Sequence, residues 1–215
     1  MTVLEDRIEI DMADENTRRL DEWFERLERM PVPEGFRVEI VGGNVHMTPQ
    51  RETHWEIIFQ IAIALRHRFG KGVRVFSDVR IDFPGHENGF CPDVVKLCES
   101  AEKDDEGRWH YEDVEFVAEV ISNGTAANDY GPKKTAYATA EVPVLLIADP
   151  YQGKCHLFTE PKDGEYVSEL SVAFGAEIDL SSPPSASPSG PTSSLATDPL
   201  PERHPLHRAH SKTLA

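Results

Sequence analysis

Two acidic residues stand where buried strands are expected. Asp93 follows Pro92 and opens the expected strand Val94–Leu97, and Glu119 lies inside the largely apolar run Val114–Ile121. A carboxylate directly after a proline indicates the mouth of a sheet rather than its middle. A carboxylate inside a core strand is costly to bury unless it is paired or bound to metal. Adjacent strands could therefore bring two carboxylates to one hard cation, with Mg²⁺ as the first choice.

The same two residues also allow a plainer interpretation. Pro-Asp is a common turn pair, and Glu119 could lie on the solvated face of an edge strand. From these residues alone, both interpretations stand open.

A third group of polar residues predicts one face of a short helix. Asp129, Lys133 and Tyr137 are spaced by four residues. A lysine near a metal-bound phosphate can stabilise developing charge or orient the attacking water, and we expect Asp129 to support the lysine helix rather than to touch substrate. The alternative is an ordinary Asp–Lys pair that supports the helix. Lys134 is expected to point elsewhere, into solvent.

Two further polar residues carry weaker signals. Glu39 alternates with Val38 and Ile40, so it lies on the opposite face of a strand. Taken alone, it is expected to face solvent on a hairpin. His54 stands at the start of a long helix and could contact phosphate, but a capping or surface histidine is the expectation.

Periodicity predicts the elements that must position these residues. They are a helix at 16–30 ended by Pro31 and Pro33, a hairpin at 36–47, a helix at 53–69 capped by Thr53, strands at 73–75, 79–83, 94–97 and 114–121, a helix at 133–140, a strand at 142–147, and a hairpin through 156–158 and 166–170. In the helix at 53–69 the apolar stripe is expected to consist of Trp55, Ile58, Phe59, Ala62, Leu65 and Phe69. This order predicts a mixed sheet flanked by helices, in the α/β or α+β class.

Composition divides the chain into three parts. Residues 1–14 are acidic and lack clear periodicity, so we expect a flexible N-terminus before one domain at 15–180. Residues 181–215 are rich in Pro and Ser and have few large apolar side chains, which predicts a disordered tail. His204, His207 and His210 in this tail are attributed to chance rather than to a metal site.

The charge and the cysteines limit the function classes. The formal net charge is −16, which opposes nucleic-acid binding because phosphate contacts normally need Lys and Arg. Bound metal ions or a partner protomer would relieve part of that charge. Cys91, Cys98 and Cys155 are odd in number and lack CxxC spacing, which argues against a disulfide framework and a zinc ribbon. No signal peptide or membrane span is expected, so a cytoplasmic protein is predicted.

The order of the motifs resembles the Uma-type restriction endonucleases, a branch of the PD-(D/E)xK restriction-endonuclease-like nucleases. The resemblance covers about residues 36–158. It runs through an acidic hairpin with a Gly turn, a His-led helix, Pro-Asp-Val, Glu-Val-Ile-Ser, Asp-x3-Lys-x3-Tyr, and a Val-Pro strand ending in Asp-Pro. The resemblance implies a restriction-endonuclease-like core, a central mixed β-sheet with flanking helices.

The resemblance also implies roles for individual residues. Asp93 matches the Pro-Asp acid, Glu119 the second acid, and Glu39 the early acid that completes the acidic cluster. The backbone carbonyl of Val120 would be a further metal ligand. The wider superfamily has a lysine two residues after the second acid, where this chain has Ile121. In the Uma-type branch a lysine on the following helix looks like the replacement, and Lys133 matches it.

Taken together, these residues lead to the hypothesis of a metal-dependent endonuclease that cleaves nucleic acid, DNA in the first place. Asp93, Glu119 and the Val120 carbonyl would hold Mg²⁺, or Mn²⁺ as a substitute, and Glu39 would position a second metal or a water. A homodimer would be required for a double-strand cut by a one-site domain. Two alternatives stay open: a catalytically inactive binding or regulatory module, which the acidic surface favours, and a metal-dependent phosphoesterase acting on small nucleotides.

Overall fold

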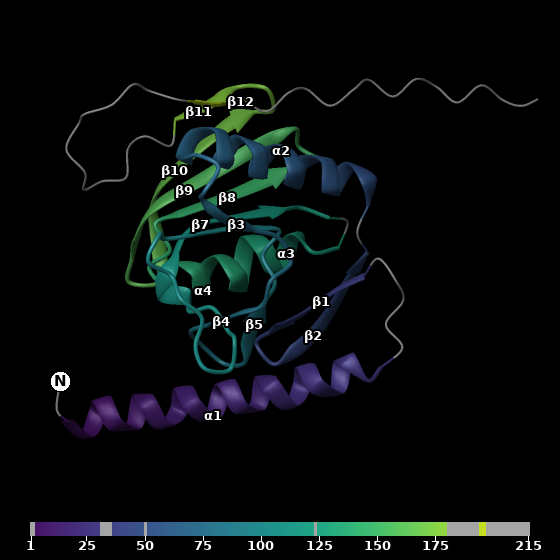
Figure 1. Ribbon diagram of the computed structural model, residues 1–215. Coiled ribbons are helices and arrows are strands. Elements are labelled where there is room, and N and C mark those ends of the chain that lie inside the picture. Colours follow the sequence, from purple (N-terminus) through teal and green to yellow (C-terminus); the bar gives the residue numbers. More distant parts are fainter. Residues whose placement is uncertain (1–2, 31–35, 50, 123, 180–193, 197–215) are drawn as a thin grey trace, which may run out of the picture.

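The computed structural model describes residues 3–30, 36–49, 51–122, 124–179 and 194–196 (Figure 1). Within these ranges, six strands form a mixed sheet in the order β10-β9-β8-β7-β6-β3. β7 and β8 run parallel, and the other neighbouring strands run antiparallel. The strands are β3 (Arg74–Phe76), β6 (Val94–Leu97), β7 (Val114–Val120), β8 (Val144–Asp149), β9 (Lys154–Lys162) and β10 (Glu165–Ala173).

A second, four-stranded sheet lies between this large sheet and the N-terminal helix α1 (Figure 1). Within the same described ranges its order is β2-β1-β5-β4. The strands are β1 (Phe36–Val41), β2 (Asn44–Pro49), β4 (Ile81–Phe83) and β5 (Asn88–Phe90). Gly42 and Gly43 have φ of 55° and 75°. Positive φ at both central positions of the turn is what a two-residue hairpin of the mirror-image type requires, so the predicted hairpin and its glycine turn are confirmed.

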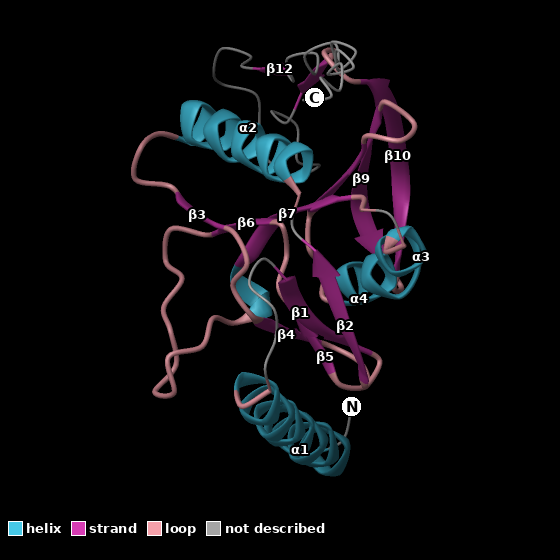
Figure 2. Cartoon of the chain, turned by 90° about the vertical axis from the view of Figure 1, so that its right-hand side faces the viewer, coloured by secondary structure: helices cyan, strands magenta, loops and turns pink. Residues whose placement is uncertain are grey.

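Helices cover both faces of the large sheet. Figure 2 shows α2 (Glu52–Phe69) on one side and α4 (Lys134–Thr139) on the other. The short helix α3 (Ala126–Asn128) and a π-helical turn (Asp129–Lys133) lead into α4, and a 3₁₀ turn (Tyr111–Asp113) precedes β7. Side chains of β7 alternate between two cores: Val117 packs with Tyr137 of α4, and Ala118 packs with Ile61 of α2. The predicted fold class, a mixed sheet flanked by helices, is confirmed.

The N-terminal helix starts earlier than the sequence analysis predicted. α1 spans Val3–Glu28, so most of the predicted flexible segment 1–14 is helical. This segment contains no Gly or Pro, and extending an existing helix is easier than starting one. Leu20 and Leu27 pack against Ile40 of β1. The predicted helix end at Pro31 and Pro33 lies outside the described residues.

The orientation of α2 differs from the predicted one. The helix begins at Glu52, and Arg51 occupies the N-cap without a side-chain hydrogen bond, so Thr53 is not the cap. Ile58 and Leu65 are buried as predicted, but Trp55, Phe59 and Phe69 are 54 %, 49 % and 44 % exposed. The buried face instead includes His54, Ile57 and Ile61. The helix is apolar on most of its circumference, so periodicity could not select the face that meets the sheet.

Three smaller observations complete the fold. Ser194–Ala196 (β12) pair with Glu177–Asp179 (β11), so these residues of the predicted disordered tail form a strand, and the remainder of 181–215 lies outside the described residues. Cys91, Cys98 and Cys155 are free thiols. Within the described part of the chain, no helix combines the length and the apolar character that crossing a membrane requires.

Candidate active site

Asp93 and Glu119 meet at one end of the same strand pair. β6 and β7 are antiparallel with Val94 opposite Ala118, which brings the start of β6 beside the end of β7. The N–H of Val120 donates a hydrogen bond of 2.7 Å to Oδ2 of Asp93. Both carboxyl groups are almost completely buried, at 1 % exposure. The predicted adjacency of the two strands is therefore confirmed, and neither acid lies on a solvated strand face.

Strand β1 adds a cation and a third carboxylate from the smaller sheet. Arg37 donates through Nη1 to Oδ1 of Asp93 and to the carbonyl of Cys91, the latter at 3.1 Å. Its Nη2 lies 3.7 Å from Oε2 of Glu39. Oε1 of Glu39 also accepts the Cys91 N–H at 2.9 Å. The alternation in β1 holds, since Ile40 packs toward α1, but Glu39 faces this buried site and not solvent.

Lys133 joins the acids of both sheets. Its Nζ lies 2.7 Å from Oε1 of Glu119, 3.0 Å from Oε1 of Glu39 and 3.4 Å from Oδ1 of Asp129. The hydroxyl of Tyr137 donates to the same Oε1 of Glu119 at 2.5 Å. Asp129, Lys133 and Tyr137 therefore share one face, as their spacing predicted. Asp129 pairs with the lysine, as expected, and belongs to the same buried cluster.

Two participants differ from the sequence expectations. His54 is buried, and its Nε2 lies 3.0 Å from Oδ2 of Asp93. The expectation of a capping or surface histidine is therefore wrong, because the buried face of α2 is turned toward the site. Arg37 was not identified as a site residue at all. It lies two residues before Glu39, and the same alternation that placed Glu39 could have placed Arg37 on the same strand face.

This acidic cluster carries more negative than positive charge. Four buried carboxylates (Asp93, Glu119, Glu39 and Asp129) face two fixed cations (Arg37 and Lys133), so the difference between these six groups is two negative charges. Such an excess is unfavourable in a low-dielectric interior unless protons or cations neutralise it.

The pKa shifts follow this charge distribution. Burial raises the pKa of Glu119 to about 8, although Lys133 opposes the shift. Burial likewise raises the pKa of Asp129. Burial alone would raise the pKa of Asp93 too, but Arg37, His54 and the Val120 N–H hold it below its ordinary value. Asp93 is therefore ionised near neutrality, whereas Glu119 retains a proton more readily.

The donor set fits a hard divalent cation. Among the buried side-chain atoms of the described residues, Oε2 of Glu119 has no hydrogen-bond partner. An unpaired carboxylate oxygen next to an excess of negative charge is the oxygen chemistry that Mg²⁺ prefers. In the described ranges no three His, Cys, Asp or Glu side chains are already arranged around one ion position. Arg37 and Lys133 contact carboxylate oxygens of Asp93 and Glu119, so an ion would replace part of those contacts.

Comparisons with known proteins bear on the family and the fold of the chain. The family model described as "Uma2: Putative restriction endonuclease" matches residues 24–187. Among solved structures, the chain is similar to a "putative nuclease belonging to DUF820 from Anabaena variabilis ATCC 29413", with a TM-score of 0.58 and 14 % identity, over 75 % of this chain and 88 % of that one. At this identity the likeness shows the fold alone. No curated protein matches the chain.

Proposed function

The chain belongs to the Uma2 family, described as "Putative restriction endonuclease", because the family model matches residues 24–187, and from this membership we propose that it is a divalent-metal-dependent endonuclease that hydrolyses phosphodiester bonds in DNA. The observation that supports the proposal is the convergence of Asp93, Glu119, Glu39 and Lys133 in one buried cluster, with one oxygen of Glu119 unpaired.

The acids would hold the metal in this reaction. Asp93, Glu119 and the carbonyl of Val120 would bind Mg²⁺, or Mn²⁺ as a substitute. When bound, the ion supplies Lewis acidity toward a phosphate oxygen and lowers the pKa of a water. Glu39 would position a water or a second ion.

The neighbouring residues would orient this donor set. Arg37 and His54 fix the carboxyl group of Asp93, one at each oxygen. The hydroxyl of Tyr137 fixes Oε1 of Glu119 and leaves Oε2 free to bind. Because these contacts are buried, the carboxylates would keep their geometry before substrate arrives, which limits the reorganisation needed in the reaction.

Lys133 would act on the reacting phosphate or on the attacking water. Its pKa is lowered by burial but raised more strongly by Glu119, Glu39 and Asp129, so it lies above its ordinary value and the ammonium stays charged. A charged Nζ next to Glu119 would offset negative charge that develops on the phosphate. Nζ of Lys133 lies 2.7 Å from Oε1 of Glu119, so the ammonium group would lie close to an ion or phosphate bound by that carboxylate.

Cleavage assays with matched lysine variants test the proposal. Purified protein would be incubated with supercoiled plasmid and with a single-stranded oligonucleotide, in Mg²⁺, Mn²⁺ or EDTA. We expect metal-dependent cleavage that falls about 100-fold or more in Asp93→Asn and in Lys133→Met, since each removes a group from the reacting centre. Lys134→Met is the control: it removes the adjacent lysine, which contacts the Phe158 ring instead, and should retain activity.

Two results would contradict the proposal. One is the absence of cleavage by the wild-type protein with either metal. The other is full activity in Asp93→Asn, with circular dichroism confirming that this variant folds.

A second candidate function is a nuclease fold without catalysis, used for binding or regulation. The net charge of −16 favours it, as does the fact that Arg37 and Lys133 already neutralise part of the acidic cluster. Titration calorimetry with Mn²⁺ separates the two functions. Mn²⁺ binding by the wild type that is lost in Glu119→Gln supports the metal-dependent enzyme. If neither the wild type nor the variant binds Mn²⁺, the result supports the non-catalytic binding or regulatory module.

A further inference from the structure

Arg37 brings an unused hydrogen-bond donor into the acidic cluster. Its side chain is only 4 % exposed, and Nη1 donates to Asp93 and to the carbonyl of Cys91. Nη2 lies 3.7 Å from Oε2 of Glu39, which is beyond hydrogen-bond distance. Among the buried side-chain atoms of the described residues, Nε of Arg37 has no hydrogen-bond partner. A buried donor without a partner is costly, so this atom points to an acceptor that binds there.

The unused donor lies on the edge of the guanidinium that suits a phosphate. Nε–H and one N–H of Nη2 point the same way from the planar group, so this edge is a fork of two donors. Such a fork matches two oxygens of a carboxylate or a phosphate. Glu39 does not fill it, because its Oε1 accepts from Lys133 at 3.0 Å and from the Cys91 N–H at 2.9 Å.

Lys133, the second cation of the cluster, has no such spare donor. Its ammonium group carries three N–H bonds, and Nζ lies 2.7, 3.0 and 3.4 Å from carboxylate oxygens of Glu119, Glu39 and Asp129. Lys133 would therefore act through its charge, whereas Arg37 has a donor free for a direct hydrogen bond. The cluster also holds an unused acceptor, Oε2 of Glu119. An unused donor and an unused acceptor in one buried site match a phosphate and the cation that accompanies it.

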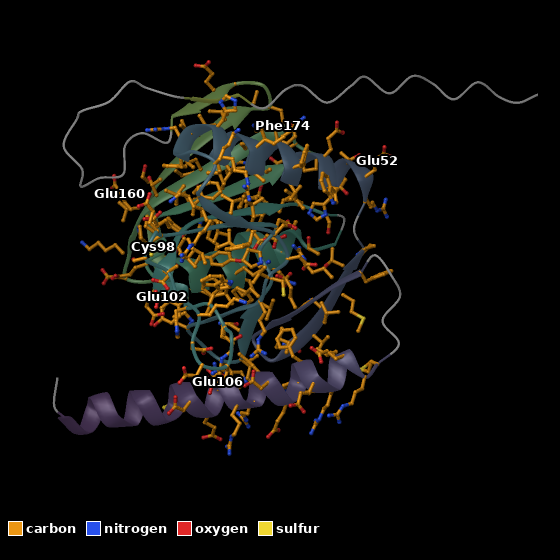
Figure 3. The ribbon with its side chains drawn as sticks, viewed as in Figure 1. Glu52, Cys98, Glu102, Glu106, Glu160 and Phe174 are labelled. Atoms are coloured by element: carbon orange, nitrogen blue, oxygen red, sulfur yellow. The ribbon has the colours of Figure 1, made fainter. Side chains whose placement is uncertain are left out.

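Asp93 would keep its orientation if Arg37 turned toward a phosphate. Oδ2 of Asp93 accepts the Val120 N–H at 2.7 Å and lies 3.0 Å from Nε2 of His54. Glu52, labelled in Figure 3, marks the end of α2 that carries His54. The charge balance allows the same change, because one divalent cation would neutralise the two excess negative charges of the cluster. Asp93 would then no longer need Arg37 as its counter-charge.

We infer that Arg37 contacts the substrate through the Nε–Nη2 edge of its guanidinium and binds the oxygens of the phosphodiester to be cleaved. This inference rests on the proposed nuclease function and adds to it a residue that recognises the phosphate group. Because the contact is to phosphate oxygens, it carries no information about base sequence. In the free protein Arg37 balances the charge of Asp93, and in the complex it balances the charge of the phosphate.

A dinucleotide with a single phosphate tests this contact. Titration calorimetry would compare thymidylyl-thymidine with its analogue in which a neutral methylphosphonate replaces the phosphate. The full-length protein would be kept in Ca²⁺, which binds oxygen ligands as Mg²⁺ does. We expect the wild type to bind the phosphate form about 10-fold more tightly, because hydrogen bonds to charged groups are the strong ones. In Arg37→Lys this preference should fall below about 3-fold, because an ammonium keeps the charge but lacks the fork.

Two controls separate this contact from a loss of folding. Arg29→Lys is the matched variant: Arg29 is exposed and forms a 3.5 Å pair with Glu25, so the preference should stay as in the wild type. Circular dichroism and urea unfolding would confirm that Arg37→Lys folds. A second measurement uses the wild type alone. In NMR spectra, the Nε–H signal of Arg37 should shift when thymidylyl-thymidine is added in Ca²⁺ and should not shift with the methylphosphonate analogue.

Three results would overturn the inference. The first is a wild type that does not distinguish the two dinucleotides, including one that binds neither. The second is a folded Arg37→Lys that keeps the full preference, or that loses affinity for both dinucleotides equally, since Arg37 would then be a structural counter-ion only. The third is an Nε–H signal of Arg37 that responds equally to both dinucleotides or to neither.

The phosphate contact and the nuclease proposal can fail separately. If the wild type cleaves plasmid with Mg²⁺ or Mn²⁺ and Arg37→Lys binds and cleaves as the wild type does, the contact is wrong and the nuclease stands. If the phosphate preference depends on Arg37 but neither metal supports cleavage, the nuclease proposal is wrong and the contact stands as phosphate binding by a non-catalytic module.

Discussion

Removing Arg37 should destabilise the protein severely, although this residue carries no obvious motif. Arg37 contacts Asp93 through a charged hydrogen bond and lies near Glu39, and all three side chains are buried. Burial alone would lower the pKa of Arg37, but Asp93 and then Glu39 raise it well above its ordinary value, so the guanidinium is always charged. Arg37→Met would preserve much of the volume and remove the charge together with the hydrogen-bond donors to Asp93 and to the carbonyl of Cys91.

The size of the effect follows from the charge excess of the acidic cluster. The substitution would increase the difference from two to three negative charges around Asp93, Glu119, Glu39 and Asp129. Breaking a buried ion pair by removing one partner costs about 3–5 kcal/mol. At roughly 2–4 °C per kcal/mol for a domain of this size, Tm should fall by about 6–20 °C.

Urea unfolding in EDTA at pH 7, followed by circular dichroism, measures this loss. Arg29→Met is the control: Arg29 is exposed and forms a 3.5 Å pair with Glu25, so its removal should change the free energy of unfolding by less than about 0.5 kcal/mol. Combining Arg37→Met with Asp93→Asn should recover part of the stability, because the unpaired carboxylate disappears. A loss below about 1 kcal/mol in Arg37→Met, or no recovery in the double variant, would refute the argument.

Three further predictions concern Glu119 and its neighbours. Without metal, the stability of the wild type should fall as pH rises from about 5 through 8, because burial raises the pKa of Glu119 to about 8 and the folded state therefore binds this proton more tightly than the unfolded state does. In Glu119→Gln, the urea midpoint should be nearly as high at pH 8 as at pH 5. A decline in this variant as steep as in the wild type would show that another group causes the pH dependence. In thermal melts, Mg²⁺ should raise the Tm of the wild type most at pH 8, where the carboxylate of Glu119 has lost its proton, and should not change the Tm of Glu119→Gln. Equal Tm shifts in the two proteins would show that the ion binds away from Glu119. Tyr137→Phe removes the donor to Glu119 Oε1 and should lower cleavage about 10-fold with little change in KM, and unchanged cleavage kinetics would show that Tyr137 serves packing only.

The sequence predicted the acids of the site because they stand out locally. A carboxylate in the apolar run 114–121 and another after Pro92 are unusual enough to indicate burial with a partner. The spacing of Asp129, Lys133 and Tyr137 predicted one shared face, and their contacts in the site agree with it, although the backbone leaves helical geometry at Gly131, with φ of −111° and ψ of −108°. These features depend on neighbouring residues, so the fold class and the placement of Asp93 and Glu119 could be predicted, whereas Glu39 was expected to face solvent when taken alone and was assigned to the site only through the family resemblance.

Arg37 and His54 could not be predicted in the same way, because their burial depends on distant contacts. Arg37 is buried only because Ile40 packs on Leu20 of α1 and turns the other face of β1 toward the large sheet. His54 is buried only because α2, which is apolar on most of its circumference, packs Ile57 and Ile61 against the large sheet. β5 was missed because its three residues, 88–90, include Gly89 and show no alternation.

The division of the site between two sheets has a consequence for the order of folding. The contact of Arg37 with Asp93 spans 56 residues, and that of Lys133 with Glu39 spans 94. Closing loops of that length carries an entropic cost that local contacts do not. A growing chain would form β6 and β7 with their acids unneutralised until the turn Asp129–Lys133 forms and β1 docks, so the complete acidic cluster, and with it the proposed cleavage activity, should be among the last features that the nascent protein acquires. Refolding followed by both circular dichroism and cleavage should therefore show secondary structure returning before activity.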